Sequence, residues 1–128
     1  MNDAELKERT KQFALRVIRL VDALPRRMVA DVLGRQLVRS ATLVAANYRS
    51  ACRAKSRADF ISKMGTDEEE ADESVLWLEL IVDAGLLPAT RLAALRVEAD
   101  ELTAITVKSI RTARARSANP QSAIRTLQ

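Results

Sequence analysis

Two adjacent stretches decide the fold of this chain: residues 35–53, RQLVRSATLVAANYRSACR, and residues 66–84, TDEEEADESVLWLELIVDA. Each stretch places apolar residues three or four positions apart, the spacing of a helix that buries one face. Each also carries a second stripe on its other side, basic in the first stretch and acidic with a tryptophan in the second. Because a helix in a monomeric bundle buries a single stripe, the second stripes predict a partner.

The composition favours one all-α domain. The chain has 128 residues, of which 48% are hydrophobic, and it has only three glycines and three prolines. Alanine, leucine, arginine and glutamate dominate, and these residues favour helix. Four aromatic residues are few for a β-sandwich or for a sheet that stacks nucleic-acid bases. We predict one domain over residues 1–116, followed by a mobile C-terminal tail over residues 117–128.

Four amphipathic segments are separated by signals that end or begin helices. Pro25 disfavours helical geometry in the residue before it. Ser56 followed by Asp59 resembles a capping box, and Gly85 is a candidate C-terminal cap. Short connections make successive helices antiparallel neighbours, which predicts an up-down-up-down four-helix bundle. The expected helices span residues 4–23, 27–53, 56–84 and 89–114.

The core stripe of each helix includes apolar residues and, in the second helix, a polar pair. Asn47 and Tyr48 lie on the core side, where we favour a buried polar network with neighbours such as Ser40, Asp67 or Glu68 over a ligand site. The predicted core residues are Leu6, Phe13, Val17, Leu20 and Leu24; Val29, Leu33, Leu37, Val44, Tyr48 and Ala51; Phe60, Met64, Ala71, Val75, Leu78 and Val82; and Leu92, Leu95, Ala99, Leu102, Ile105 and Ala113.

Several function classes are disfavoured by what the sequence lacks. There is no histidine, which removes Ser-His-Asp and Cys-His catalysis, Cys/His zinc sites and the Glu-x-x-His di-iron pattern. The single Cys52 is interpreted as a packing residue. We expect no catalytic residue, metal, cofactor or small-molecule substrate. No apolar run approaches the length of a membrane span and the first residues do not resemble a signal peptide, so we expect a cytoplasmic protein.

The second stripes predict a subunit interface. Both repeat a 4-3-4-3-4 spacing, typical of helices that pack against another helix. Arginine and tryptophan are enriched in interfaces, and arginine pairs bidentately with carboxylates, so we expect Arg39 and Arg49 to meet Glu70 and Glu73. The alternative is a solvated helix face with ordinary charges. The predicted interface residues are Arg35, Arg39, Arg49, Arg53, Glu70, Glu73, Trp77 and Leu80.

Several ordered motifs resemble one protein family. They are residues 40–49 (SATLVAANYR), 56–64 (SRADFISKM) and 69–80 (EEADESVLWLEL), with further matches at 9–14, 17–21 and 98–102. They resemble the four-helix-bundle proteins associated with 23S ribosomal RNA intervening sequences. Thr66 and Asp67 depart from the pattern, since the family more often has apolar residues there, and this affects the expected packing of the third helix.

The resemblance implies more than the residues do. It implies a bundle that assembles into a ring-like homopentamer with a poorly defined role. The family also looks related to the accessory subunit of diversity-generating retroelements, which resembles a basic pentamer that binds a reverse transcriptase and its RNA. The expected partners are therefore further copies of the chain, and RNA or a nucleic-acid enzyme.

Charge is distributed in blocks along the chain. Residues 1–57 carry a net charge of +8, residues 58–101 carry −9 and residues 102–128 carry +5. Opposite blocks suggest pairing within or between subunits first, and a basic surface for nucleic acid second. No base-reading module is visible, so binding is expected to depend on salt and weakly on sequence. The candidate phosphate contacts are Lys7, Lys11, Arg19, Arg26, Arg27, Lys108, Arg111, Arg114 and Arg116.

Two other functions stay open at this point. Glu70-x-x-Glu73 and Glu98-x-x-Glu101 place carboxylate pairs one turn apart on two helices. All-α nucleotide pyrophosphohydrolases hold Mg²⁺ with comparable clusters, so a Mg²⁺-dependent enzyme is one alternative. A structural adaptor without a nucleic-acid role is the other. We favour a non-enzymatic homo-oligomer that binds RNA or a nucleic-acid enzyme.

Overall fold

The chain folds into four α-helices, and no strand occurs in residues 1–118, the part that the structure describes. The structure is a computed structural model. The helices are α1 (Asp3–Asp22), α2 (Met28–Cys52), α3 (Arg57–Asp83) and α4 (Ala89–Ala118). The prediction of an all-α protein with four helices is confirmed. α4 extends past its expected end, and positions 119–128 of the predicted mobile tail lie outside the described residues.

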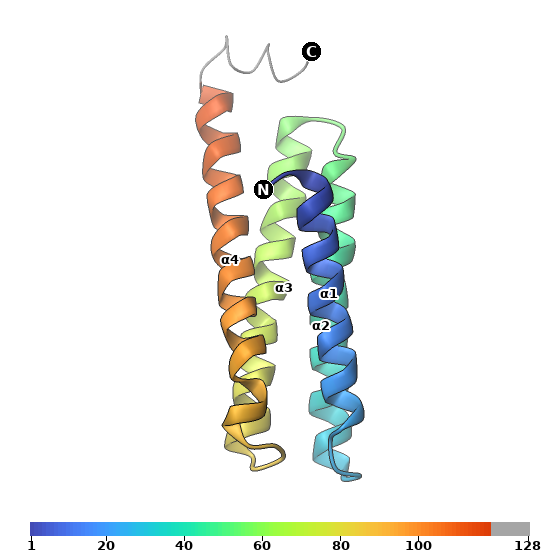
Figure 1. Cartoon of the computed structure of the whole chain (residues 1–128). Coiled ribbons are helices and arrows are strands. Elements are labelled where there is room, and N and C mark those ends of the chain that lie inside the picture. The colour runs from blue at the N-terminus through green and yellow to red at the C-terminus, as the bar shows by residue number, and fades with distance from the viewer. Residues whose placement is uncertain (119–128) are drawn as a thin grey trace.

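The helices lie side by side, and the chain reverses direction at each loop (Figure 1). α2 packs against both α1 and α3, whereas α4 packs against α3 far more extensively than against α1. One end of the molecule holds the start of α1, the α2–α3 loop and the last turns of α4 (Figure 1). We call it the α2–α3 end. The opposite end holds the other two loops, and we call it the α1–α2 end.

Side-chain caps determine where two of the helices begin. Asn2 accepts a hydrogen bond from the Glu5 backbone N–H at 2.8 Å, and the Glu5 carboxylate accepts one from the Asn2 backbone, which completes a capping box. Ser56 accepts from the Asp59 backbone N–H at 3.0 Å, as predicted. The Asp59 carboxylate accepts from the backbone of Lys55 instead of Ser56. This cap therefore extends one residue further than the sequence motif predicts.

Two glycines are required by the backbone. Gly85 adopts a φ of 72° after the last turn of α3, a left-handed conformation that glycine adopts without strain. Gly34 lies where α1 and α2 approach closely. A Cβ atom at this position would lie 2.9 Å from Val21 and 3.1 Å from Leu24. The glycine therefore shortens the distance between the two helices, at the cost of its own low helix propensity.

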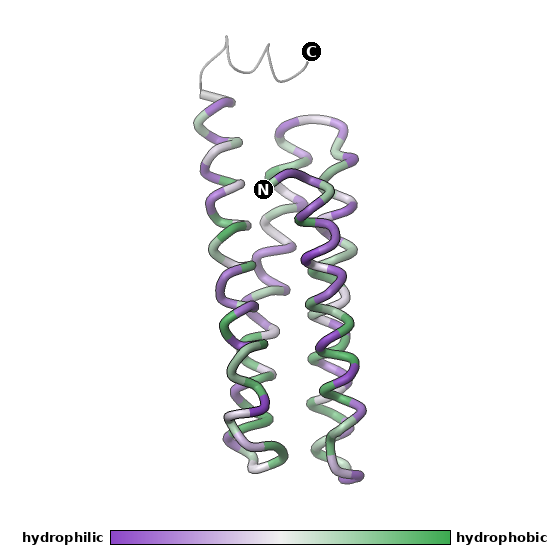
Figure 2. Tube along the Cα trace, viewed as in Figure 1, coloured by the Kyte–Doolittle hydropathy of each residue, from purple (hydrophilic) through white to green (hydrophobic). Residues whose placement is uncertain are grey.

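The core lies between the four helices. Figure 2 shows hydrophobic residues recurring along each helix between hydrophilic ones, as expected for helices with one buried side. Val29 is the main departure, since it is 49% exposed. Ala30 is buried in its place, because one residue turns a helix by about 100°. Within residues 1–118, no helix is long and apolar enough to cross a membrane. The largest fully buried side chains include Phe13, Leu37, Met64, Leu78, Ile81, Leu92 and Leu102.

Candidate interaction surfaces

A cluster of charged side chains joins α2 to α3 within one chain, and we call it the Arg39 cluster. Arg39 lies 3.4 Å from Glu70 through Nη1 and forms a second ion pair with Glu73 through Nη2. Trp77 donates from Nε1 to the same Glu73 oxygen at 3.2 Å. Burial raises the pKa of the Glu70 carboxyl, and the positive charge of Arg39 offsets this only in part. The two predicted stripes therefore meet inside a single subunit at this point.

Apolar side chains continue the Arg39 cluster toward the α1–α2 end. Val32 follows on α2 at seven residues from Arg39, which is two helical turns, and it is 53% exposed. On α3, Leu80 follows Trp77 by one turn and is 36% exposed, while Trp77 itself is half-buried. We call this surface the outer face. Its apolar members are Met28, Val29, Val32, Leu76, Trp77 and Leu80.

The structure separates the eight predicted interface residues into two groups. Six of them lie on or beside the outer face. Arg49 and Arg53 are exposed near the C-terminal end of α2, about 15 Å or more from Arg39 along the helix axis. Arg49 therefore does not join Arg39 at Glu70 and Glu73 within the chain.

Sequence reasoning missed the N-terminal half of the outer face. The stripe of Arg35 and Arg39 continues backward through Val32 and Met28 at the same spacing. Counting the repeat backward would have found these two residues.

A second cluster of one arginine and two glutamates joins α1 to α4, and we call it the Arg9 cluster. Arg9 donates from Nε and Nη2 to the two oxygens of Glu98 at 2.9 and 2.6 Å, and Nη2 also contacts Glu101. The hydrogen bond from Arg9 lowers the pKa of the Glu98 carboxyl. Both carboxylate pairs considered as Mg²⁺ ligands thus face an arginine. Residues 1–118 contain no group of three or more His, Cys, Asp or Glu side chains placed to hold a metal ion.

Tyr48 finds a partner on another helix than predicted. Its hydroxyl donates to Oδ1 of Asp3 at 3.0 Å, and its neighbour Asn47 is half-buried. Ser40, an expected partner, bonds instead to Ser74 across α2 and α3, with the oxygens 2.8 Å apart. Tyr48 pairs with Asp3 because it lies near the C-terminal end of α2, beside the start of α1, whereas Ser40 lies about two turns further along the bundle.

Asp67 is a buried carboxyl without an arginine. It lies on α3, is 2% exposed, and its Oδ1 has no hydrogen-bond partner in the part of the chain that the structure describes. Burial, with a smaller contribution from the negative charge of Glu70, raises its pKa to about 8. Asp67, where the family more often has an apolar residue, is therefore a polar group buried inside the bundle.

The predicted phosphate contacts gather at both ends of the bundle. Six lie at or toward the α2–α3 end and three at the α1–α2 end. All are exposed except Lys7, which is half-buried. The α2–α3 end is cationic, because residues 1–7, 49–60 and 108–116 hold nine lysines and arginines against three acidic residues. The first group is Lys7, Lys11, Lys108, Arg111, Arg114 and Arg116; the second is Arg19, Arg26 and Arg27.

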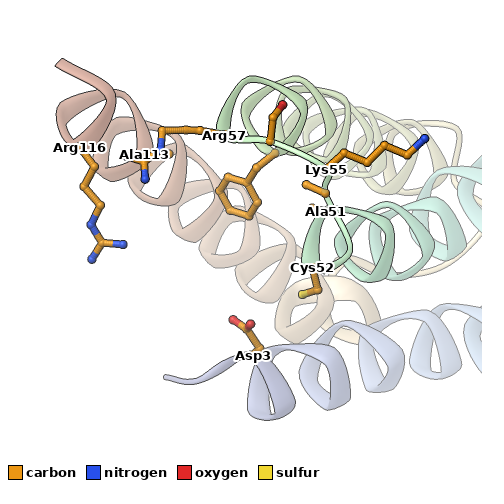
Figure 3. Close-up of a pocket in the computed structure, with 10 residues that line it drawn as sticks. Asp3, Ala51, Cys52, Lys55, Arg57, Ala113 and Arg116 are labelled. Atoms are coloured by element: carbon orange, nitrogen blue, oxygen red, sulfur yellow. The ribbon is translucent and has the colours of Figure 1, made fainter. Parts of the chain in front are cut away.

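A cleft of about 530 Å³ opens at the α2–α3 end, and Figure 3 shows residues that line it. The start of α1, the end of α2, the first turn of α3 and the last turns of α4 all contribute to its walls. Lys55 and Arg57 are lining residues that the prediction of phosphate contacts omitted. Cys52 also lines the cleft as a half-buried free thiol.

Comparison with known proteins gives the chain a family. Residues 2–108 match the family model of the 23S rRNA-intervening sequence protein. A solved structure, a protein of unknown function from the S23 ribosomal protein family of Bacteroides thetaiotaomicron, is 31% identical with a TM-score of 0.80. The match covers 87% of this chain and 99% of that one. No curated protein matches the chain. Since the family model spans most of its length, the chain belongs to the 23S rRNA-intervening sequence protein family.

Proposed function

We propose that this protein is a non-enzymatic homo-oligomer, a ring of five up-down-up-down bundles, that binds RNA through its basic ends. The outer face is the observation that carries the assembly. It leaves Val32 and Leu80 exposed and Trp77 half-buried on the two helices that the ion pairs of Arg39 join. Monomers rarely expose contiguous apolar patches of this kind, and patches rimmed by polar groups are typical of interfaces.

The charge distribution supports RNA as the ligand. The α2–α3 end carries an excess of exposed lysines and arginines on three helices and a loop. Such a surface attracts phosphates, and a ring would repeat it around one axis, which increases the effective concentration of contacts. The resemblance to retroelement accessory subunits supports the same ligand. The arginines bound to both carboxylate pairs favour this function over a Mg²⁺-dependent enzyme.

The assembly is tested by light scattering on two matched variants. Leu80→Glu places a charge on the outer face, whereas Val97→Glu places the same charge on an exposed apolar position of α4 outside it. We expect the wild type and Val97→Glu to have about five times the chain mass of 14.2 kDa, and Leu80→Glu to have a lower mass. A monomeric wild type at micromolar concentration would contradict the proposal, as would equal masses for the two variants.

RNA binding is tested separately with a structured RNA at about 50 mM salt. We expect binding that weakens steeply as salt rises, with little dependence on sequence, because phosphate contacts release counterions. If no RNA binds at this salt while the oligomer is intact, the RNA half of the proposal is wrong and a structural adaptor becomes the better interpretation.

A further inference from the structure

The cleft at the α2–α3 end has the size and composition of a ligand site. Its volume of about 530 Å³ lies within the range of roughly 300–1,000 Å³ that small-molecule pockets occupy. It combines small apolar walls, including Ala51 and Ala113, with one aromatic ring, Phe60, and the cations Lys55, Arg57 and Arg116. Among the described residues that line it, Asp3 is the acidic one, and its Oδ1 already accepts the hydrogen bond from Tyr48.

Arg57 in this cleft lacks an acceptor. The residue as a whole is half-buried, but its Nη1 and Nη2 atoms are both buried, and neither has a hydrogen-bond partner in the part of the chain that the structure describes. Arg9 and Arg39, in contrast, each contact two glutamates. A buried cation without an acceptor is unfavourable, and native structures almost always supply one. Figure 3 shows Arg57 extending from the start of α3 toward Ala113 of α4, inside the group of lining residues.

The chemistry around Arg57 selects the class of ligand. A guanidinium donates two parallel hydrogen bonds to a phosphate. Helix α3 begins at this residue, and the positive end of its dipole also favours the negative charge of a phosphate. Phe60 follows one turn later on α3 and gives the cleft a ring on which a base can stack. Lys55 and Arg116 also line the cleft and are further positively charged residues of its walls.

We infer that this cleft binds a nucleoside monophosphate, with the phosphate on Arg57 and the base against Phe60. The group could come from a free nucleotide or from the 5′ end of an RNA strand, and both present the same chemistry. The second source rests on the proposed RNA binding, whereas the first does not. An acidic peptide, which offers carboxylates but no base, is the competing occupant.

The experiment compares Arg57→Gln with Arg91→Gln in the full-length protein. Both variants remove one positive charge, but Arg91 lies exposed at the α1–α2 end, in the first turns of α4. Calorimetric titrations use 5′-AMP, adenosine, inorganic phosphate and a glutamate-rich hexapeptide. Two RNA decamers, one with a 5′-phosphate and one with a 5′-hydroxyl, distinguish the sources.

We expect 5′-AMP to bind the wild type more tightly than adenosine or the peptide, and Arg57→Gln to weaken this binding at least about tenfold. Arg91→Gln should change it less than about twofold. Phe60→Leu should weaken 5′-AMP but not inorganic phosphate. Arg57→Gln should remain folded, with an unfolding temperature no lower than that of the wild type, because it removes two buried nitrogens that have no acceptor among the described residues.

The outcomes separate this inference from the proposed function. If 5′-AMP and the 5′-phosphorylated decamer fail to bind, or if both variants weaken them equally, the cleft is not a nucleotide site. Tighter binding of the peptide would also overturn it. If RNA binds but Arg57→Gln weakens neither RNA nor 5′-AMP, the cleft inference fails and RNA binding stands. If 5′-AMP binds through Arg57 and no RNA binds, the proposed RNA binding fails and the cleft inference stands.

Discussion

The Arg9 cluster and the Arg39 cluster contain the same three side chains but differ in how well the charges are paired. Arg9 contacts both oxygens of Glu98 at 2.9 and 2.6 Å, whereas Arg39 approaches Glu70 no closer than 3.4 Å. The pKa of the Glu98 carboxyl is lowered by its arginine, and the pKa of Glu70 is raised by burial in spite of its arginine.

The difference indicates two roles for one set of residues. The Arg9 cluster is complete within the chain, and it joins α1 to α4, the least closely packed of the contacting helix pairs in the described part of the chain. The Arg39 cluster leaves Glu70 incompletely paired beside the exposed outer face, where a second subunit could add a cation. Asp67, one turn before Glu70, extends the comparison to a buried carboxyl without any arginine.

The largest effect is expected at Asp67. Its pKa of about 8 in the folded chain exceeds the value of 3.8 for a free side chain, so the folded state binds the extra proton between these values. The free energy of unfolding of the wild type should therefore fall as pH rises from about 4 to about 8. Asp67→Asn should remove this loss and stabilise the protein by a few kcal/mol, or roughly 2–4, at pH 8–9. Urea denaturation across this pH range measures it.

Asp72→Asn is the matched control, because Asp72 lies on the same helix and is exposed. Its unfolding free energy should follow that of the wild type at every pH. A difference between Asp67→Asn and the wild type that is independent of pH would show that Asp67 is ionised in the folded protein, and would remove the contrast with Glu98.

A smaller effect is expected at the Arg9 cluster. Arg9→Met keeps the apolar stem but leaves Glu98, 15% exposed, without its donors. The variant should lose about 1–2 kcal/mol at pH 7. Because the pKa of Glu98 is lowered in the folded state, this contribution is present above the unfolded pKa near 4.5 and is lost as pH falls through the folded value. Arg19→Met, at an exposed position of α1, should have no comparable effect on the free energy of unfolding, at pH 7 or at acidic pH.

The sequence was sufficient to predict the four helices and the buried face of each helix. The cap at Ser56, the left-handed Gly85 and the apolar spacing are local signals, and the structure confirms each of them. The inner face of α2 was predicted well except at Val29. This error arose in the first turn, where a short periodic pattern does not distinguish position 29 from position 30.

Contacts between helices were harder to predict. The bond from Tyr48 to Asp3 joins residues 45 positions apart, and nothing in either helix alone indicates it. Arg57 was missed for a similar reason. Beside Ser56 it looks like an ordinary charge in a first turn, and nothing in that turn indicates that its Nη1 and Nη2 atoms are buried. Periodicity locates a residue on its own helix, but not the neighbour that covers it.

The smallest effect on unfolding, and the sharpest test of the comparison, is expected at Arg39. Arg39→Met removes a guanidinium that is 44% exposed, compared with 27% for Arg9, so it should destabilise the isolated chain less than Arg9→Met does. If the outer face is a subunit contact, the same variant should weaken self-association, measured by light scattering on dilution, whereas Arg9→Met should not. Equal effects of the two variants on both measurements would mean that the Arg39 cluster, like the Arg9 cluster, only holds two helices of one chain together.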